Sequence, residues 1–232
     1  MDDILRFERE NTVSAEKQVS EVIVRSAEAG SPKILFVGNS ITLHGIKPDI
    51  GWHGLWGMAA SAREKDYVHQ TMRMAREIRP EAGYMIVQAA DWERGFWLNE
   101  EKLERVRAAR EYDADIIVIR LGENVRTEDM ERYELLPAFE RMIDFFNPSG
   151  RAKVIVTDMF WPVPEKDRIA AQAARDKGAA MVRISDLGTK DEMKAIGLFE
   201  HSGVAVHPGD LGMLKIAEAI FAAMKPMLEG GN

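Results

Sequence analysis

Five short apolar runs, rich in isoleucine and valine, recur along the chain without clean alternation between apolar and polar positions. Runs of this kind are typical of strands that are buried on both faces of a parallel sheet. The predicted strands are residues 34–37, 84–87, 115–121, 153–157 and 180–184.

Charged stretches with helical spacing separate these runs. The predicted helices are residues 65–78, 100–112, 127–146 and 164–177, and an apolar stripe at 3.6-residue spacing predicts a closing helix over residues 211–228. This alternation predicts an α/β fold: a three-layer α/β/α sandwich around a flavodoxin-like, doubly wound parallel sheet of about five strands. We expect one domain over residues 1–232, with a helical extension over about residues 1–30, and a functional site at the carboxyl ends of the strands.

Composition narrows the classes of function. The chain has 232 residues, of which 46% are hydrophobic and 30% charged, as in an ordinary globular domain. A net charge of −7 without a basic run argues against a nucleic-acid partner, and the absence of cysteine excludes disulfides, thiolate metal sites and a cysteine nucleophile. No secretory signal or membrane-spanning run stands out, so we expect a soluble cytoplasmic protein without a membrane partner.

Histidines and carboxylates do not show metal-ligand spacing, so we expect no metal and no other cofactor. Four histidines are interpreted as solvated or packing residues. These four are His44, His53, His69 and His201. His44, four residues after Ser40, could also line a site beside this serine.

A serine stands where the first predicted strand ends, in the sequence Gly38-Asn39-Ser40. Glycine permits a tight turn, and Ser40 would then begin a helix whose N–H groups point at developing negative charge. Two other interpretations remain open. Ser40 is also a common kind of helix cap, and the turn resembles a phosphate cradle of a flavodoxin-like flavin-binding module, although it lacks the lysine of a P-loop.

Three later segments favour the first interpretation. Gly57 lies in the loop after the first strand, Asn124 follows the third strand in Gly-Glu-Asn, and His207 precedes the closing helix. Ser40, Gly57, Asn124 and His207, in this order, resemble the four marker residues of the SGNH (GDSL-like) hydrolase superfamily. The resemblance extends from about residue 33 to the last helix.

The resemblance implies a serine esterase that hydrolyses an acyl ester. Ser40 would be the nucleophile and His207 its base, while the N–H groups of Ser40 and Gly57 and the amide of Asn124 would form the oxyanion hole. The substrate would be a small-molecule or carbohydrate ester, with an acetylated carbohydrate as one fitting class. A thioesterase or lysophospholipase on the same scaffold and an inactive binding relative are the alternatives.

All five tryptophans follow predicted strands, on the edge where Ser40 lies. Such rings commonly pack loops onto a core, but rings that face a cleft make platforms for sugar rings. The candidate substrate-binding rings are Trp56, Trp92 and Trp161.

One position departs from the family pattern. The family's histidine usually follows an aspartate by three residues, and Val204 occupies that position here. Asp210 is nearby but is expected to be the N-cap of the closing helix. Because the imidazole still needs a fixed tautomer, we expect a backbone carbonyl in the loop before His207 to accept from Nδ1. Carboxylates from elsewhere are the alternative; in order of preference they are Glu200, then Glu123 and Asp158.

Overall fold

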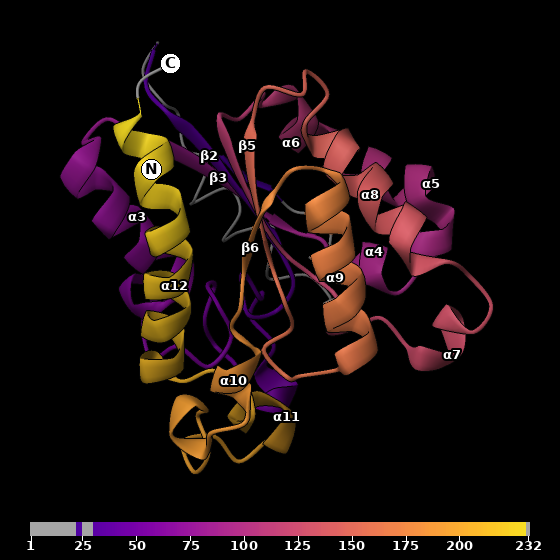
Figure 1. Ribbon diagram of the computed structural model, residues 1–232. Helices are drawn as coiled ribbons and strands as arrows, with labels where there is room; N and C mark the ends of the chain where they lie inside the picture. Colours follow the sequence, from indigo (N-terminus) through magenta and orange to yellow (C-terminus); the bar gives the residue numbers. More distant parts are fainter. Residues whose placement is uncertain (1–21, 25–29, 231–232) are drawn as a thin grey trace.

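The computed structural model describes residues 22–24 and 30–230, and these residues form one six-stranded sheet between two layers of helices (Figure 1). The strand order is β1-β3-β2-β4-β5-β6. The strands are β1 (Val22–Val24), β2 (Lys33–Gly38), β3 (Gly83–Gln88), β4 (Ile116–Arg120), β5 (Lys153–Thr157) and β6 (Ala180–Val182). β1 pairs antiparallel with β3, and the other five strands are parallel.

The five parallel strands are the five predicted from the apolar runs. Their spatial order, with the first strand between the second and third, is the flavodoxin-like order. Val37 lies opposite Val87 on one side and Ile119 on the other, so the most apolar positions stand side by side at the centre of the sheet. The α/β sandwich predicted from the sequence is therefore confirmed.

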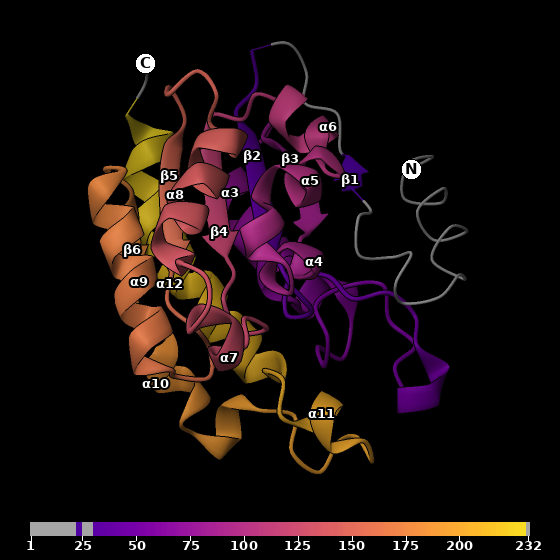
Figure 2. The ribbon, with the colours of Figure 1, turned by 90° about the vertical axis from the view of Figure 1, so that its right-hand side faces the viewer.

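Helices cover both faces of the sheet (Figure 2). The longer ones are α3 (Tyr67–Ile78), α8 (Leu135–Phe146), α9 (Pro164–Asp176) and α12 (Asp210–Glu229); the shorter ones are α4 (Ala90–Glu93), α5 (Asn99–Glu104), α6 (Arg107–Glu111), α7 (Thr127–Met130), α10 (Ser185–Gly188) and α11 (Ser202–Ala205). Short 3₁₀ turns occupy Pro48–Ile50, Arg63–Lys65, Phe96–Leu98 and Asp191–Met193.

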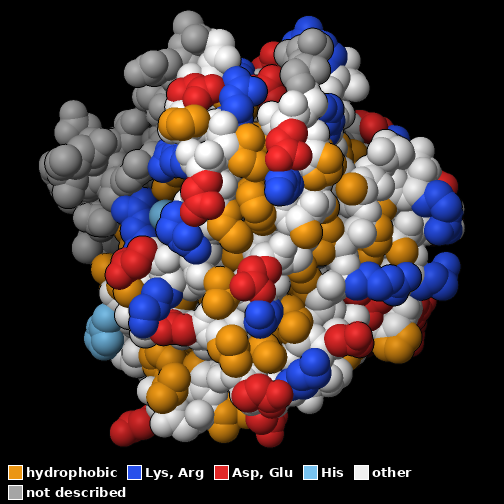
Figure 3. All heavy atoms as spheres, turned by 60° about the vertical axis from the view of Figure 1, so that its left-hand side comes forward, with side chains coloured by type: hydrophobic (Ala, Val, Ile, Leu, Met, Phe, Trp, Pro, Cys, Tyr) orange, Lys and Arg blue, Asp and Glu red, His pale blue; other side chains and the backbone are white. Residues whose placement is uncertain are grey.

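The two layers have separate apolar cores. α3 and α12 pack together on one face, over a core that includes Phe36, Tyr67 and Met213. α5, α6, α8 and α9 cover the other face, over a core that includes Trp92 and Phe139. Charged side chains of both signs lie among apolar ones on the outer surface of the first layer (Figure 3). No helix in the described part of the chain is long and apolar enough to cross a membrane.

Some helix boundaries differ from the prediction. The stretch 100–112 forms two short helices, α5 and α6, and the stretch 127–146 forms α7 and α8. Most of the helical extension predicted before the first strand lies outside the described residues. Its residues Val22–Val24 form strand β1, so the prediction of helix is wrong there.

The closing helix starts one residue earlier than expected. Gly209 is its N-cap and Asp210 its first residue, so the prediction that Asp210 is the N-cap is wrong. The Asp210 carboxylate instead accepts hydrogen bonds from Ser61 N and Oγ, each at 2.8 Å, and from Lys65 Nζ at 2.8 Å. These contacts fasten the long connection between β2 and α3 to the start of α12.

Candidate active site

Ser40 lies in a tight turn after β2. The carbonyl oxygen of Asn39 accepts hydrogen bonds from Thr42 N at 2.9 Å and Leu43 N at 3.0 Å, and the turn then ends. The prediction that Ser40 begins a helix is therefore wrong, because the chain continues as a loop until Arg63 apart from one short 3₁₀ turn. A Cβ at position 38 would collide with Thr42 Oγ1, which explains the glycine. Ser40 N has no acceptor among the described residues.

Ser40 and His207 are in hydrogen-bonding contact although 167 positions separate them. Ser40 Oγ lies 2.8 Å from His207 Nε2, and His207 Nδ1 lies 2.6 Å from the carbonyl oxygen of Gly203. Since a carbonyl only accepts, Nδ1 carries the proton and Nε2 offers its lone pair to the serine hydroxyl. The carbonyl contact predicted for Nδ1 is present, and it comes from the one-turn helix α11 directly before His207.

The surroundings of His207 keep its imidazole neutral. Burial lowers the pKa of His207 to about 4, the hydrogen bond to Gly203 opposes this shift, and the nearby His44 and Arg120 add to it. The Trp161 ring lies 5.1 Å from the imidazole, with its plane at 82°, and its Nε1 donates to Val206 O at 3.2 Å. A neutral imidazole is the form that can accept a proton from serine.

A cavity of about 400 Å³ opens beside this pair, and Ser40, His207, Asn124 and Gly203 all border it. A second hollow of about 470 Å³ lies at the opposite edge of the sheet, near Pro32 and the start of β5, and none of the described residues that line it is a histidine. The serine and histidine therefore lie at the carboxyl ends of the strands, where parallel α/β sheets bind ligands.

Asn124 is held by a buried carboxylate. Its Nδ2 donates to Glu93 Oε2 at 2.5 Å, and Glu93, which is fully buried, also accepts from Gly122 N at 2.6 Å and Asn39 Nδ2 at 3.1 Å. Burial raises the pKa of Glu93, the Glu123 charge raises it further, and the hydrogen bonds act in the opposite direction. The amide of Asn124 has two protons, so one remains for a group in the cavity.

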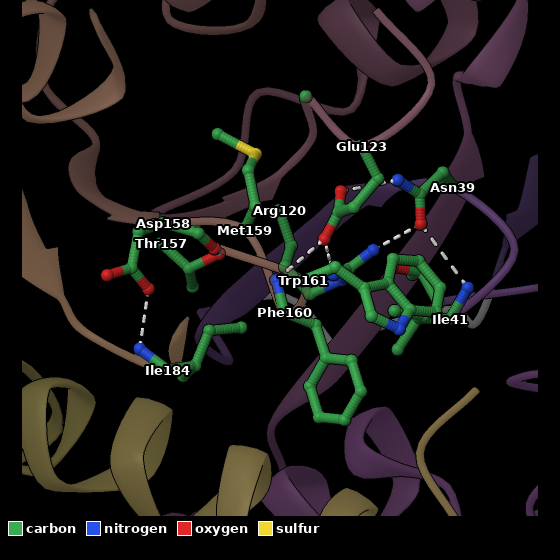
Figure 4. Close-up of polar contacts among 12 residues, drawn as sticks. Asn39, Ile41, Arg120, Glu123, Thr157, Asp158, Met159, Phe160, Trp161 and Ile184 are labelled. Atoms are coloured by element: carbon green, nitrogen blue, oxygen red, sulfur yellow. Dashed lines mark hydrogen bonds and ion pairs between the residues drawn. The ribbon is translucent and has the colours of Figure 1, made fainter. Parts of the chain in front are cut away.

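A second buried carboxylate, that of Glu123, contacts Asn39 in the turn that carries Ser40 (Figure 4). Arg120, fully buried at the end of β4, forms an ion pair of 2.5 Å with Glu123 and donates to Asn39 Oδ1. Glu123 also accepts from Asn39 Nδ2 at 2.7 Å and from Phe160 N at 3.0 Å. The Glu123 carboxylate therefore serves these internal donors, and it makes no hydrogen bond with His207, for which it was an alternative partner.

Gly57 is not placed as predicted. Its N–H donates to the buried carboxylate of Asp66 at 3.2 Å, and the residue does not border the cavity. Its neighbour Met58 does border it and donates its N–H to Ser40 O at 2.9 Å. The assignment of Gly57 to the oxyanion hole is therefore corrected: its donor already has an acceptor.

Two of the three candidate tryptophans are also placed elsewhere. Trp92 lies in the core with its Nε1 on Asn99 Oδ1 at 2.6 Å. Trp56 donates to Ala60 O at 2.8 Å, and neither ring borders the cavity. Both pack loops onto the protein, as large rings commonly do. Only Trp161 stands beside the Ser40–His207 pair, against the imidazole.

The remaining carboxylate candidates do not orient His207. Asp158 accepts from Ile184 N at 2.5 Å and from Ser185 N and Oγ, and so fixes the start of α10. Glu200 is exposed and makes no hydrogen bond with His207. Within the described part of the chain, no group of histidines and carboxylates is arranged to hold a metal ion.

Comparison with known proteins supports the fold. No family model matches the sequence, and no curated protein matches it either. Among solved structures, a family 3 carbohydrate esterase from Clostridium thermocellum has a TM-score of 0.58 at 15% identity, over 86% of this chain and 98% of that one. An acetyl xylan esterase, AlAXEase, has a TM-score of 0.52 at 16% identity, over 82% and 98%. A two-domain esterase active on acetylated mannans has a TM-score of 0.51 at 13% identity, over 86% of this chain and 50% of that one. These likenesses, all at 16% identity or less, show that the chain shares the α/β fold of these carbohydrate esterases, which agrees with the fold that the motifs led us to expect.

Proposed function

We propose that this protein is a serine esterase in which Ser40 is the nucleophile and His207 the general base. The observation that carries the proposal is the chain of contacts from Ser40 Oγ to His207 Nε2, and from His207 Nδ1 to the Gly203 carbonyl. These two contacts fix the tautomer that a base needs, without a carboxylate as the third member of a triad. The pair also borders a cavity large enough for a small ester.

The reaction follows from these contacts. Ser40 Oγ attacks the acyl carbon while its proton passes to His207 Nε2, and a new C–O bond forms as the carbonyl oxygen becomes an oxyanion. The oxyanion accepts from Ser40 N–H and from the second amide proton of Asn124. The bond to the alcohol oxygen then breaks, and His207 returns the proton to that oxygen. Water, activated by the same imidazole, releases the acid and regenerates Ser40.

The preferred substrate class is an acyl ester with a small acyl group, such as an acetyl group on a carbohydrate. Three proteins with the same fold are esterases by name, and two of these act on acetylated polysaccharides. The cavity of about 400 Å³ suits a short acyl chain with part of its alcohol. Hydrolysis of a thioester or lysophospholipid would use the same residues, so the relative rates on an acetylated sugar, a thioester and a lysophospholipid decide between these classes.

The nucleophile is tested by covalent labelling. An organophosphonate should modify Ser40, and S40A should lose both the label and the turnover of 4-nitrophenyl acetate. S61A is the matched control, since Ser61 is exposed in the same loop and contacts Asp210 rather than histidine. A label on Ser61, or a protein that carries bound flavin and hydrolyses no ester, would overturn the proposal.

The oxyanion donor is tested with N124A. Its kcat should fall by about 10²–10³ with a smaller change in KM, because the amide acts mainly on the transition state. Unfolding in urea checks that the variant stays folded, since Asn124 also contacts Glu93. An unchanged kcat in folded protein would remove Asn124 from the oxyanion hole.

A further inference from the structure

The cavity beside Ser40 has a charge opposite to that of the protein around it. The chain carries 38 acidic against 31 basic residues. Among the described residues that line the cavity, the permanently charged ones are Lys47 and Arg94, both positive, and none is an aspartate or glutamate. His44 and His201 border it as well. A concave site lined by one sign of charge attracts ligands of the other sign.

Arg94 is available to a ligand. It follows α4, and its backbone N–H is held by Ala90 O at 3.3 Å. Its side chain is exposed and forms no ion pair or hydrogen bond with any described residue. Arg105, eleven residues further along the chain at the end of α5, instead pairs with Asp91 and Glu101. Arg94 therefore borders the cavity, and no described residue accepts from its guanidinium donors.

Lys47 approaches from a different loop with a fixed backbone. Its N–H donates to Trp52 O at 2.8 Å, and its carbonyl accepts from Trp52 N at 3.1 Å. Among the described residues its ammonium pairs with Asp49 alone, at 3.4 Å, and the Asp49 side chain is 69% exposed. An exposed pair of this kind contributes little, so a ligand anion can replace Asp49. Asp49 itself does not border the cavity.

Both cations act on the same part of the cavity, next to the Ser40–His207 pair. Burial lowers the pKa of His44 most, and the charges of Lys47 and Arg94 lower it further, against the opposing hydrogen bond to Gly45 and the charge of Asp49. His44 is thus neutral near pH 7 and adds no charge of its own, and it also lies within electrostatic reach of His207. Lys47 and Arg94 both border the cavity that a substrate would fill.

We propose that the ester substrate carries a carboxylate, which Lys47 and Arg94 bind while Ser40 attacks the acyl carbon. This inference rests on the proposed esterase function and names its substrate class. The planar guanidinium suits a carboxylate, which it can bind through two parallel hydrogen bonds, and the lysine adds a second, mobile donor. A charge-assisted hydrogen bond of this kind changes kcat/KM by about 10- to 100-fold.

Two matched pairs of esters test the inference and show which half of the substrate is charged. 4-Nitrophenyl glutarate is compared with 4-nitrophenyl valerate for a charged acyl half, and 4-acetoxybenzoate with 4-acetoxybenzamide for a charged alcohol half. In at least one pair the anionic ester should have a kcat/KM about 10- to 100-fold higher, and added salt should reduce this ratio.

The variants K47Q and R94Q should each lower the ratio of anionic to neutral kcat/KM by about tenfold. R126Q is the matched control, because Arg126 is exposed, pairs only loosely with Glu128 at 3.5 Å and does not border the cavity. Its ratio should equal that of the wild type. Ratios near or below one in both wild-type pairs, or a preference that survives both substitutions, would overturn the inference.

Failure of the esterase function is a separate outcome. If wild-type protein hydrolyses no ester, calorimetric titration of the S40A protein still measures binding of 4-acetoxybenzoate against 4-acetoxybenzamide, and of the glutarate against the valerate. Tighter binding of an anionic ester that is lost in S40A/R94Q supports the carboxylate site. Equal affinities within both pairs refute it.

Discussion

Glu93 offers the sharpest test of how the candidate oxyanion donor is held. The substitution E93Q keeps the shape of the side chain but replaces one acceptor oxygen by an amide donor. In the wild type, Glu93 accepts from Asn124 Nδ2 at 2.5 Å, Gly122 N at 2.6 Å and Asn39 Nδ2 at 3.1 Å. The NH₂ group of a glutamine at this position would face one of these N–H groups, and two donors cannot bond to each other. At least one of the contacts is therefore lost.

The magnitudes follow from these contacts. A hydrogen bond to a charged acceptor contributes about 1.5–3 kcal/mol, and the loss of one or two is partly offset because the buried charge and its repulsion from Glu123 disappear. We expect the free energy of unfolding to fall by about 1–3 kcal/mol. Removal of an oxyanion donor costs about 10²–10³ in kcat, so a donor that is present but loosely oriented should cost about 10- to 100-fold.

Urea unfolding and steady-state hydrolysis of 4-nitrophenyl acetate measure the two effects on the same protein. D91N is the matched control, since Asp91 lies on the same short helix but pairs at the surface with Lys102 at 3.0 Å and Arg105 at 2.9 Å. It should keep the wild-type kcat. A folded E93Q protein with lowered stability and an unchanged kcat would show that Glu93 is structural only. Unchanged values of both would refute the whole argument.

Three further predictions concern the base, a glycine and the missing carboxylate. Because burial lowers the pKa of His207 to about 4, kcat/KM should fall only as the pH drops below about 4, and a fall centred near 6.5 in a stopped-flow pH series would contradict this. G122A, at φ +138° with Met159 in the path of its Cβ, should lower the free energy of unfolding by about 2–5 kcal/mol in urea unfolding. G150A, at φ +68° with open space around it, should lower it by about 1–2 kcal/mol in the same measurement. E200Q should keep kcat within about tenfold, since the exposed Glu200 does not contact the imidazole, and a loss near 10⁴ would identify it as a third catalytic residue.

The sheet was predictable because its signal is local. Each parallel strand is a run of isoleucine and valine that has to be buried on both faces, and the runs coincide with β2 to β6 to within two residues at each end. β1 is also made of valine and isoleucine, but its run of three residues, Val22–Val24, is shorter than any of the five predicted strands, so it did not stand out. Ser40 and His207 were found because the carboxyl ends of parallel strands meet at one edge.

The errors at the site come from long-range pairing. Gly57 has the expected place in the sequence order, but Asp66, at the N-cap of α3, takes its N–H, and nothing in the local pattern reveals this contact. Arg120 could have been suspected, since a charged residue that ends an apolar strand has to be paired when buried. Its partners are Asn39 and Glu123, which lie in two different loops. Glu93 contacts Asn39 from helix α4, and the local pattern could not predict these contacts.

The absence of a carboxylate at Val204, where the family that the sequence resembles usually has an aspartate, fits the charge of the cavity. Val204 is fully buried among apolar residues that include Trp52 and Met58, where a carboxylate would be costly. The Gly203 carbonyl fixes the imidazole of His207 without adding a negative charge, and burial keeps the pKa of His207 low although this hydrogen bond opposes the shift. An aspartate there would raise that pKa and would also weaken the attraction of Lys47 and Arg94 for an anion. A neutral partner for the proposed base is therefore compatible with the proposed carboxylate-bearing substrate in the same small cavity.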